Sequence, residues 1–430
     1  MIKRFLIVST CIFLLTNNAK SYNKTITVEH SYLPEILLKE GVASSTLSNY
    51  MKEAWDISWK RFYRPETQLF YDYLISYKHG KWLSHLPKAE EVLRGYPNSY
   101  GYGTGMEDCM ISAGIMLCMI VDRYAVTHDE KMKKYALLVA QGIFRCATVH
   151  GIPGFLARGV CVEDQKSIYI ASSRDQYTHA VHGLWYYFNS PLCDSETKIE
   201  IGKVLSSIAD RMEQNVTPEN DYDFLRADGS RDPRGISRMW NVSGHEAARL
   251  PMIYAAAWNT TGNTKYYELY RRYIKQAVDQ SFKAEPTTTT YALLQMQCSF
   301  ELLKSLEQDD DLKKQMDEIM TLVSKLVYSR AINANKTAST LDLTMLTTDW
   351  RTGVGINTGS EYRKVWYCVR ESGEAALTLL IDPNNSFTEE QNELLKKAIT
   401  RLDYKHVSTS GIFYLQGAYW KARRCKISGF

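Results

Sequence analysis

Acidic residues stand at the start of three successive apolar stretches of this sequence. Glu107 and Asp108 follow a glycine-rich run, Asp175 follows a Ser-Ser-Arg sequence, and Glu246 follows a Ser-Gly-His sequence. The interval along the chain from Asp108 to Asp175 is nearly equal to that from Asp175 to Glu246. Two carboxylates that flank a cleft are the groups that hydrolysis of a glycosidic bond requires. We therefore predict that Asp108, Asp175 and Glu246 are catalytic.

Asp175 is followed by an apolar stretch rich in aromatic residues, from Trp185 to Phe188. Burial in such surroundings is expected to raise its pKa, so that it keeps its proton near neutral pH as a general acid must. A structural explanation competes, because first-turn acids also interact favourably with the helix dipole and Glu246 has the spacing of a capping box with Ser243. The recurrence of acids at three helix starts favours the catalytic explanation.

Aromatic residues and arginines gather near the same predicted helix starts. Aromatic rings stack on the faces of sugars, and arginine side chains pair with carboxylates, which favours an anionic sugar over a neutral one. We predict a substrate-binding set of Glu107, Tyr102, Arg158, Arg174, Tyr177, Arg234, Arg238, Trp240, His245 and Trp366.

Metal and nucleotide signatures are missing from the sequence. It contains no HExxH, no EF-hand loop, no clustered His and Cys, and no phosphate-cradling GxxxxGK[ST]. We expect no essential metal and no cofactor.

Helical periodicity predicts twelve helices that alternate in character. The stretch 106–124 is apolar nearly all round, which indicates burial from several sides, whereas 129–148 is amphipathic. The same alternation continues along the chain. The predicted helices span 45–63, 106–124, 129–148, 174–188, 195–214, 246–258, 264–282, 290–306, 311–328, 362–380, 388–402 and 412–422.

Six such hairpins bury a continuous core only by stacking on their neighbours, and they can close into a ring with the apolar helices inside. We predict an all-α fold, a single (α/α)6 barrel over residues 22–430. An open α-solenoid is the alternative, although a solenoid would not require its inner helices to begin with acidic and aromatic residues.

The segment from Met1 to Ser21 has the composition of a signal peptide. Lys3 and Arg4 precede the apolar run from Phe5 to Leu15, and Ala19-Lys20-Ser21 offers a small-x-small cleavage pattern. The run is too short to anchor the chain in a bilayer. We expect a soluble, exported protein, periplasmic or secreted, with no membrane span in the rest of the chain.

The net charge gives no basis for nucleic-acid binding. The chain has 52 Lys and Arg against 48 Asp and Glu, or +4, and the predicted signal peptide holds three of those cations and no acid. The mature chain is therefore close to neutral. Its cysteines are scattered and largely within apolar stretches, which favours buried thiols over disulfides; they are Cys109, Cys118, Cys146, Cys161, Cys193, Cys298, Cys368 and Cys425.

Three motifs together resemble the six-hairpin glycosidases, in particular the unsaturated glucuronyl and unsaturated rhamnogalacturonyl hydrolases. The motifs are Gly-Met-Glu-Asp ending at Asp108, Ser-Arg-Asp-Gln-Tyr around Asp175, and the loop from Trp240 to Glu246. In those families the second acid protonates the substrate and then activates water, which implies that Asp175 is the acid/base and Asp108 its partner. The families' Gly-Arg-Gly run is replaced here by Ser-Gly-His-Glu, so an ordinary exo-acting uronidase or rhamnosidase remains open.

The expected function is hydrolysis of uronic-acid- or rhamnose-containing oligosaccharides during polysaccharide degradation, with an anionic oligosaccharide as the partner. A polysaccharide lyase is the first alternative, and it would depend on Tyr177, His179, His182 and His245. A sugar epimerase of the same architecture would use paired histidines. A glycan-binding protein without catalysis is the remaining alternative.

Overall fold

Six apolar helices form an inner ring in the computed structural model, which describes residues 42–353, 355–356 and 359–430. Each inner helix contacts the next, and α13 contacts α3, which closes the ring. This closure confirms the predicted (α/α)6 barrel and excludes an open solenoid, whose terminal helices do not meet. The inner helices are α3 (Cys109–Thr127), α5 (Arg174–Phe188), α7 (Arg249–Thr261), α9 (Thr290–Leu306), α11 (Glu361–Ile381) and α13 (Gly411–Arg424).

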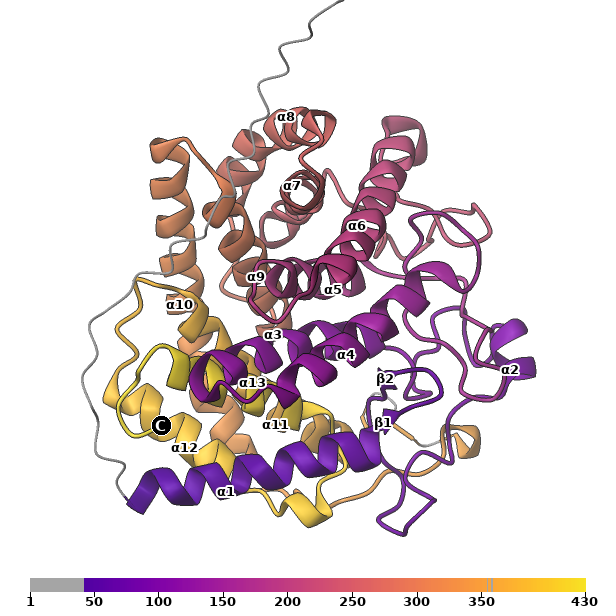
Figure 1. Ribbon diagram of the computed structural model, residues 1–430. Coiled ribbons are helices and arrows are strands. Elements are labelled where there is room, and N and C mark those ends of the chain that lie inside the picture. The colour runs from indigo at the N-terminus through magenta and orange to yellow at the C-terminus, as the bar shows by residue number, and fades with distance from the viewer. Residues whose placement is uncertain (1–41, 354, 357–358) are drawn as a thin grey trace, which may run out of the picture. The chain divides into compact units, whose positions relative to one another are not determined.

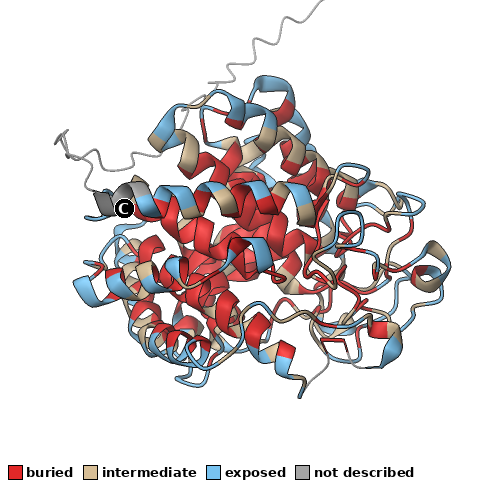
Figure 2. Cartoon of the chain, turned by 90° about the horizontal axis from the view of Figure 1, so that it is seen from below, coloured by how far each residue is buried: buried red, intermediate tan, exposed pale blue. Residues whose placement is uncertain are grey.

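Six amphipathic helices pack around this ring (Figure 1). On α8, for example, Tyr266, Leu269, Tyr270 and Ile274 are buried at helical spacing, whereas Lys265 is exposed. Buried residues accordingly concentrate in the central helices and exposed residues on the outer ones (Figure 2). The outer helices are α1 (Val42–Ile57), α4 (Lys131–Thr148), α6 (Ser195–Asn215), α8 (Thr264–Ser281), α10 (Asp310–Ala338) and α12 (Glu389–Thr400).

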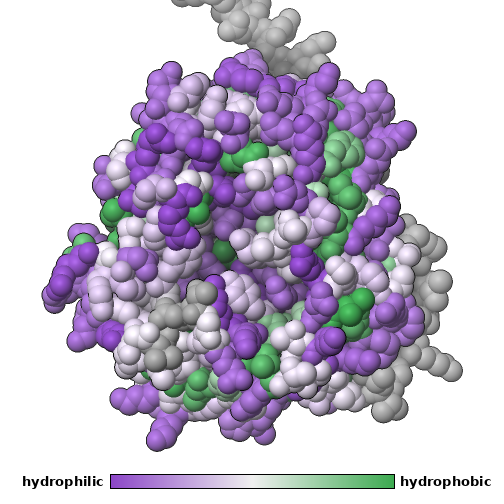
Figure 3. All heavy atoms as spheres, turned by 180° about the vertical axis from the view of Figure 1, so that it is seen from behind, coloured by the Kyte–Doolittle hydropathy of each residue, from purple (hydrophilic) through white to green (hydrophobic). Residues whose placement is uncertain are grey.

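The loops of the barrel differ in length between its two ends. Only residues 128–130 connect α3 to α4, and only 262–263 connect α7 to α8. The connections that lead into inner helices are longer, and 149–173 before α5 and 216–248 before α7 are among the longest. The starts of the inner helices are therefore surrounded by long loops. A hollow with mainly hydrophilic walls opens near the centre of one face (Figure 3).

Short elements lie between the long helices. A π-helical turn (Ser58–Phe62) continues α1 and leads into a hairpin of β1 (Tyr63–Arg64) and β2 (Leu69–Phe70), in which Tyr63 pairs with Phe70. The remaining short elements are α2 (Ala89–Leu93) and 3-10 turns at Pro218–Asn220, Gly244–Glu246, Trp350–Thr352 and Tyr404–His406.

Close packing of α3 against α5 depends on glycine. A Cβ at Gly114 would lie 2.1 Å from the carbonyl oxygen of His179, and one at Gly183 would lie 2.8 Å from the Cα of Gly114. Any larger residue at either position would push the two inner helices apart.

Several helix boundaries differ from the prediction: α1 ends at Ile57 instead of residue 63, and α3 begins at Cys109 instead of residue 106. The third inner helix begins at Arg249 instead of residue 246, which places Pro251 in its first turn, where a missing N–H leaves no hydrogen bond unmade. Glu246 accordingly lies in a separate 3-10 turn. The helix α10 continues to Ala338, ten residues beyond its predicted end.

The predicted signal peptide and the domain boundary at residue 22 lie outside the described residues, which form one compact unit. Within that unit α3 is long and apolar enough to cross a membrane, by length and composition alone. It is an inner helix of the barrel and most of it is buried, which explains its composition. All eight described cysteines are free thiols and six are buried, as predicted.

Candidate active site

The long loops bring the starts of the inner helices together at one end of the barrel, which we call the rim. Asp108 precedes α3 and accepts hydrogen bonds from Gln176 of α5, at 3.1 Å, and from Arg370 of α11, at 2.9 Å. Asp175, in the first turn of α5, accepts a hydrogen bond of 2.6 Å from Arg249 of α7. The structure therefore places Asp108 and Asp175 at the same end, on neighbouring inner helices.

Asp108 is held on both carboxylate oxygens. Oδ1 accepts from Gln176 and lies 3.9 Å from Nη1 of Arg158, and Oδ2 accepts from Arg370. Its side chain is 16% exposed and makes no capping hydrogen bond to α3, although Asp108 occupies the N-cap position. Helix capping therefore does not account for this acid. Its backbone N–H donates to Oδ2 of the buried Asp72, at 3.0 Å.

Asp175 is more open. Its side chain is 30% exposed, and one oxygen is bonded to Arg249, itself almost fully buried. Burial acts to raise the pKa of Asp175, but the charges of Arg249, Arg174 and Arg158 outweigh it, and the pKa lies below its usual value. This corrects the prediction of a protonated Asp175, because the sequence did not show that three arginines surround this carboxylate. In the free protein Asp175 is ionised at neutral pH.

Glu107 points into the protein instead of the rim. Its carboxylate accepts backbone hydrogen bonds from Gly103, at 3.0 Å, and from Gly105, at 2.8 Å. Burial and the neighbouring Asp108 raise the pKa of Glu107 to about 7. Glu107 therefore braces the glycine-rich loop that leads into α3, and its predicted role in substrate binding is wrong.

Three arginines that carry charge into the rim are almost fully buried. Arg158 stacks over Tyr102, at 5.0 Å from the ring centroid, and its Nε and Nη2 have no hydrogen-bond partner in the described chain. Arg370 pairs with Glu374, at 2.6 Å, as well as with Asp108. Arg249 is the third. The guanidinium groups are buried, so they act on the rim through their positive charge, which favours an anionic ligand there.

Glu246 lies at the same rim but is occupied by an ion pair. Nε of Arg174 donates to Glu246 Oε1 at 2.5 Å, and Arg174 also bonds the carbonyl oxygen of Gly235 at 2.7 Å. The imidazole of His245 lies 3.8 Å from Glu246, is partly exposed, and has a pKa lowered by burial. Arg174 and Glu246 thus fasten the loop before α7 to α5, whereas His245 is a neutral imidazole at the rim.

The loop 222–240 contributes one arginine to the rim. Arg234 lies 4.6 Å above the ring of Tyr100 and 4.8 Å above that of Tyr102, and it makes no ion pair within the described chain. Tyr100 is fixed by a hydrogen bond of 3.2 Å to Asp232. Arg238, predicted to bind substrate, pairs instead with Asp221 near the surface.

Two predicted aromatic contacts are also wrong. Tyr177 is fully buried, its hydroxyl accepts the N–H of Leu156 at 2.8 Å, and its ring packs 4.6 Å from Phe224. The ring of Trp240 packs against Tyr273 of α8, at 4.7 Å. Both side chains therefore pack inside the protein. Their positions in the sequence do not show whether the rings are buried or exposed at the rim.

The histidines proposed for a lyase are not gathered. His182 lies seven residues beyond Asp175 on α5, about 10 Å further along the helix axis, and bonds Glu301 at 2.8 Å. His179 is buried, and burial lowers its pKa to about 3. With Tyr177 in the core, only His245 of that set is at the rim.

Several rim residues escaped the sequence analysis. Tyr291 lies near Asp175, because the negative charge of Asp175 adds to burial in raising the pKa of Tyr291. Tyr367 lies near Asp108 for the same reason, since the charge of Asp108 adds to burial in raising the pKa of Tyr367. Arg370 reaches Asp108 from the third turn of α11, deeper than the helix starts that the sequence marks. Trp366, which the sequence predicted to bind substrate, lies one turn before Arg370 and is buried, with the guanidinium 5.0 Å from its ring.

No metal-binding group of three or more His, Cys, Asp or Glu side chains occurs among residues 42–353, 355–356 and 359–430.

No protein-family model matches this chain, and no curated protein matches it. Solved structures with a similar chain trace include a sugar epimerase from a ruminal bacterium, with 15% identity over 87% of this chain and 98% of that one, and a TM-score of 0.48. Cellobiose 2-epimerase from Spirochaeta thermophila DSM 6192 has 11% identity over 90% and 99%, with a TM-score of 0.46. The GH76A alpha-1,6-mannanase from Salegentibacter sp. HEL1_6 has 15% identity over 67% and 88%, with a TM-score of 0.36. Likenesses this distant do not identify the reaction of this chain.

Proposed function

We propose that this protein is a glycoside hydrolase that acts on oligosaccharides with a uronic acid at the cleaved end. The observation that supports it most is the partly exposed carboxylate of Asp175, at the same rim as Asp108 and on the neighbouring inner helix, with arginines and tyrosines around it. Glycosidic bond cleavage needs carboxylates that handle a proton and stabilise positive charge at the sugar. Asp108 and Asp175 are the acids suited to it, because Glu107 and Glu246 are both engaged in holding loops.

The arginines suit an acidic sugar. Arg234 is exposed and lies over the ring of Tyr102 without a carboxylate partner among the described residues, and the buried Arg158 adds positive charge beside the same ring. A sugar carboxylate beside Arg234 would be paired electrostatically, while Tyr102 would contact the ring face.

Binding of an acidic sugar would also allow Asp175 to take up the proton that it lacks in the free protein. A substrate carboxylate near Arg158, Arg174 and Arg249 adds negative charge beside Asp175 and offsets the arginines that keep it ionised, so the pKa of Asp175 rises on binding. Asp175 then takes up a proton and donates it to the leaving oxygen. The carboxylate that results can remove a proton from the attacking water, while Asp108, fixed by Gln176 and Arg370, stabilises the charge on the sugar.

A panel of uronide- and rhamnose-ended oligosaccharides tests this proposal. Hydrolysis of an uronide-ended member, with no new absorbance at the ultraviolet band of unsaturated uronates, is the expected result. A gain of that absorbance would make the protein a lyase, with the neutral His245 and Tyr291 as its base and acid. Epimerised product without cleavage, or binding without turnover of any member, would also contradict the proposal.

A further inference from the structure

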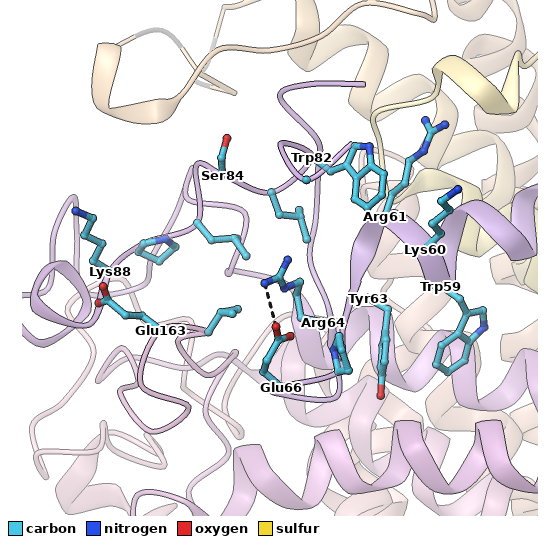
Figure 4. A pocket seen from close by; sticks show the side chains of 16 residues that line it. Trp59, Lys60, Arg61, Tyr63, Arg64, Glu66, Trp82, Ser84, Lys88 and Glu163 are labelled. Carbon is cyan, nitrogen blue, oxygen red and sulfur yellow. Dashed lines mark hydrogen bonds and ion pairs between the residues drawn. The ribbon is translucent and has the colours of Figure 1, made fainter. Parts of the chain in front are cut away.

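A cavity of about 690 Å³ shares no lining residue with the rim. Its walls come from the π-helical end of α1, the β1–β2 hairpin, the loop 80–88 and residues Val162 and Glu163 (Figure 4). Its volume is in the range of roughly 300–1,000 Å³ that is typical of ligand pockets.

The cavity carries more positive than negative charge. Lys60, Arg61, Arg64 and Lys88 line it, against Glu66 and Glu163. Arg64 pairs with Glu66 at 3.1 Å, and Glu163 accepts the backbone N–H of Ala89 at 2.8 Å. Among the described residues, Lys60, Arg61 and Lys88 form no ion pair. Arg61 donates a hydrogen bond to the carbonyl oxygen of Lys405 at 2.6 Å, so Lys60 and Lys88 are the two cations left to face an anionic ligand.

Aromatic side chains form two walls of the same cavity. Trp59 and Tyr63 pack against each other at 4.7 Å and are backed by Phe70 and Tyr135, so this wall is rigid. Trp82 projects from the loop on the other side, beside Arg61 in Figure 4. Aromatic rings with neighbouring cations are the combination that holds a sugar ring by its C–H face and its carboxylate by charge.

The cavity and the rim are built from the same two loops. Val162 follows Arg158 of the rim by four residues, which limits their separation to about 14 Å along the chain. Likewise, Pro87 and Lys88 precede the short α2 and the loop that carries Tyr102.

We propose that this cavity is a second binding site for an acidic oligosaccharide, separate from the site of reaction. Its cations bind the carboxylates of the chain and Trp82 contacts a sugar ring. The class of ligand rests on the function proposed for the rim, whereas binding in the cavity does not require catalysis there. A site of this kind would hold a polymeric chain close to the rim between cleavage events.

Isothermal titration of the full chain with a galacturonic acid hexamer tests the proposal, in an Asp175→Asn background that prevents turnover. Lys60→Ala with Lys88→Ala, and separately Trp82→Ala, should each weaken one class of binding sites about tenfold. Lys81→Ala is the matched control, because Lys81 is exposed on the same loop but does not line the cavity. Arg234→Ala at the rim should leave this class unchanged.

The proposal is overturned if the hexamer does not bind, if Lys81→Ala weakens binding as much as the cavity variants, or if a neutral glucose hexamer binds equally well. It is also overturned if tripolyphosphate displaces the hexamer while Trp82→Ala has no effect, since the cavity would then bind any polyanion. If the hexamer binds in the cavity but not at the rim, the proposed function is contradicted and the proposal of the second site is not.

Discussion

Arg249 is the residue on which the charge of Asp175 depends most, and its removal has a calculable effect. At 2.6 Å and an effective dielectric constant of 20, the attraction between the two side chains is about 6 kcal/mol before desolvation is subtracted. Breaking a buried pair by removing one partner costs about 3–5 kcal/mol. Because Asp175 retains contact with solvent, we expect Arg249→Met to lower the free energy of unfolding at pH 7 by about 3 kcal/mol.

The pH dependence separates charge from packing. In the wild type the depressed pKa of Asp175 stabilises the fold above pH 4, and this stabilisation is lost as pH falls through that pKa. Without Arg249, only Arg174 and Arg158 oppose the effect of burial, so the pKa of Asp175 rises and the variant gains less stability than the wild type as pH rises. The cost of Arg249→Met should therefore be smaller at pH 4 than at pH 7 by at least about 1.4 kcal/mol, one pKa unit.

Urea unfolding at both pH values measures these differences. Adding Asp175→Asn to Arg249→Met should recover part of the loss at pH 7, because no buried charge is left unpaired. Arg94→Met, which breaks an exposed pair with Glu90, is the control and should cost less than about 1 kcal/mol. An Arg249→Met cost that is equal at pH 4 and pH 7, and unchanged by Asp175→Asn, would refute the electrostatic explanation.

Three further outcomes are expected. Since burial raises the pKa of Glu107 from 4.5 to about 7, the free energy of unfolding should fall by about 3 kcal/mol as pH rises through that interval, and a pH series on Glu107→Gln should lack this loss. Arg234→Ala should raise KM for an acidic oligosaccharide about tenfold and change kcat little, as measured by initial rates; an unchanged KM would remove Arg234 from the site. Binding of a non-cleaved acidic sugar at pH 6 should take up about one proton, by calorimetry in buffers of different ionisation enthalpy, and none in Asp175→Asn.

The barrel could be predicted because its signal is local and repeated. The alternation of apolar and amphipathic helices, with turn signals between them, reflects burial on all sides or on one side, and the sequence shows this directly. The start of α7 was placed too early because Ser243 and Glu246 mimic a capping box, although Pro251 already indicated a later start.

The site was only partly predictable, because it depends on side-chain direction and on partners distant in the chain. The shared position of Asp108 and Asp175 at one end of the barrel could be predicted from their places at helix starts. Nothing local indicates that Glu107 turns inward, or that Arg370 reaches Asp108 from a distant part of the chain. The prediction that Asp175 is protonated was wrong for the same reason. Its aromatic neighbours can be identified in the sequence, whereas the arrangement of the arginines around its carboxylate cannot.

The most direct test of catalysis by this carboxylate pair is kcat of Asp175→Asn on an uronide-ended oligosaccharide that the wild type cleaves. General acid/base groups contribute roughly 10²–10⁴ in rate, so kcat should fall by at least about a hundredfold in Asp175→Asn and comparably in Asp108→Asn, with folding preserved. Glu246→Gln, which removes a loop-fastening carboxylate, should lower kcat much less. If Asp175→Asn retains most of the activity while Glu246→Gln abolishes it, Asp175 is not the acid/base and the central claim is wrong.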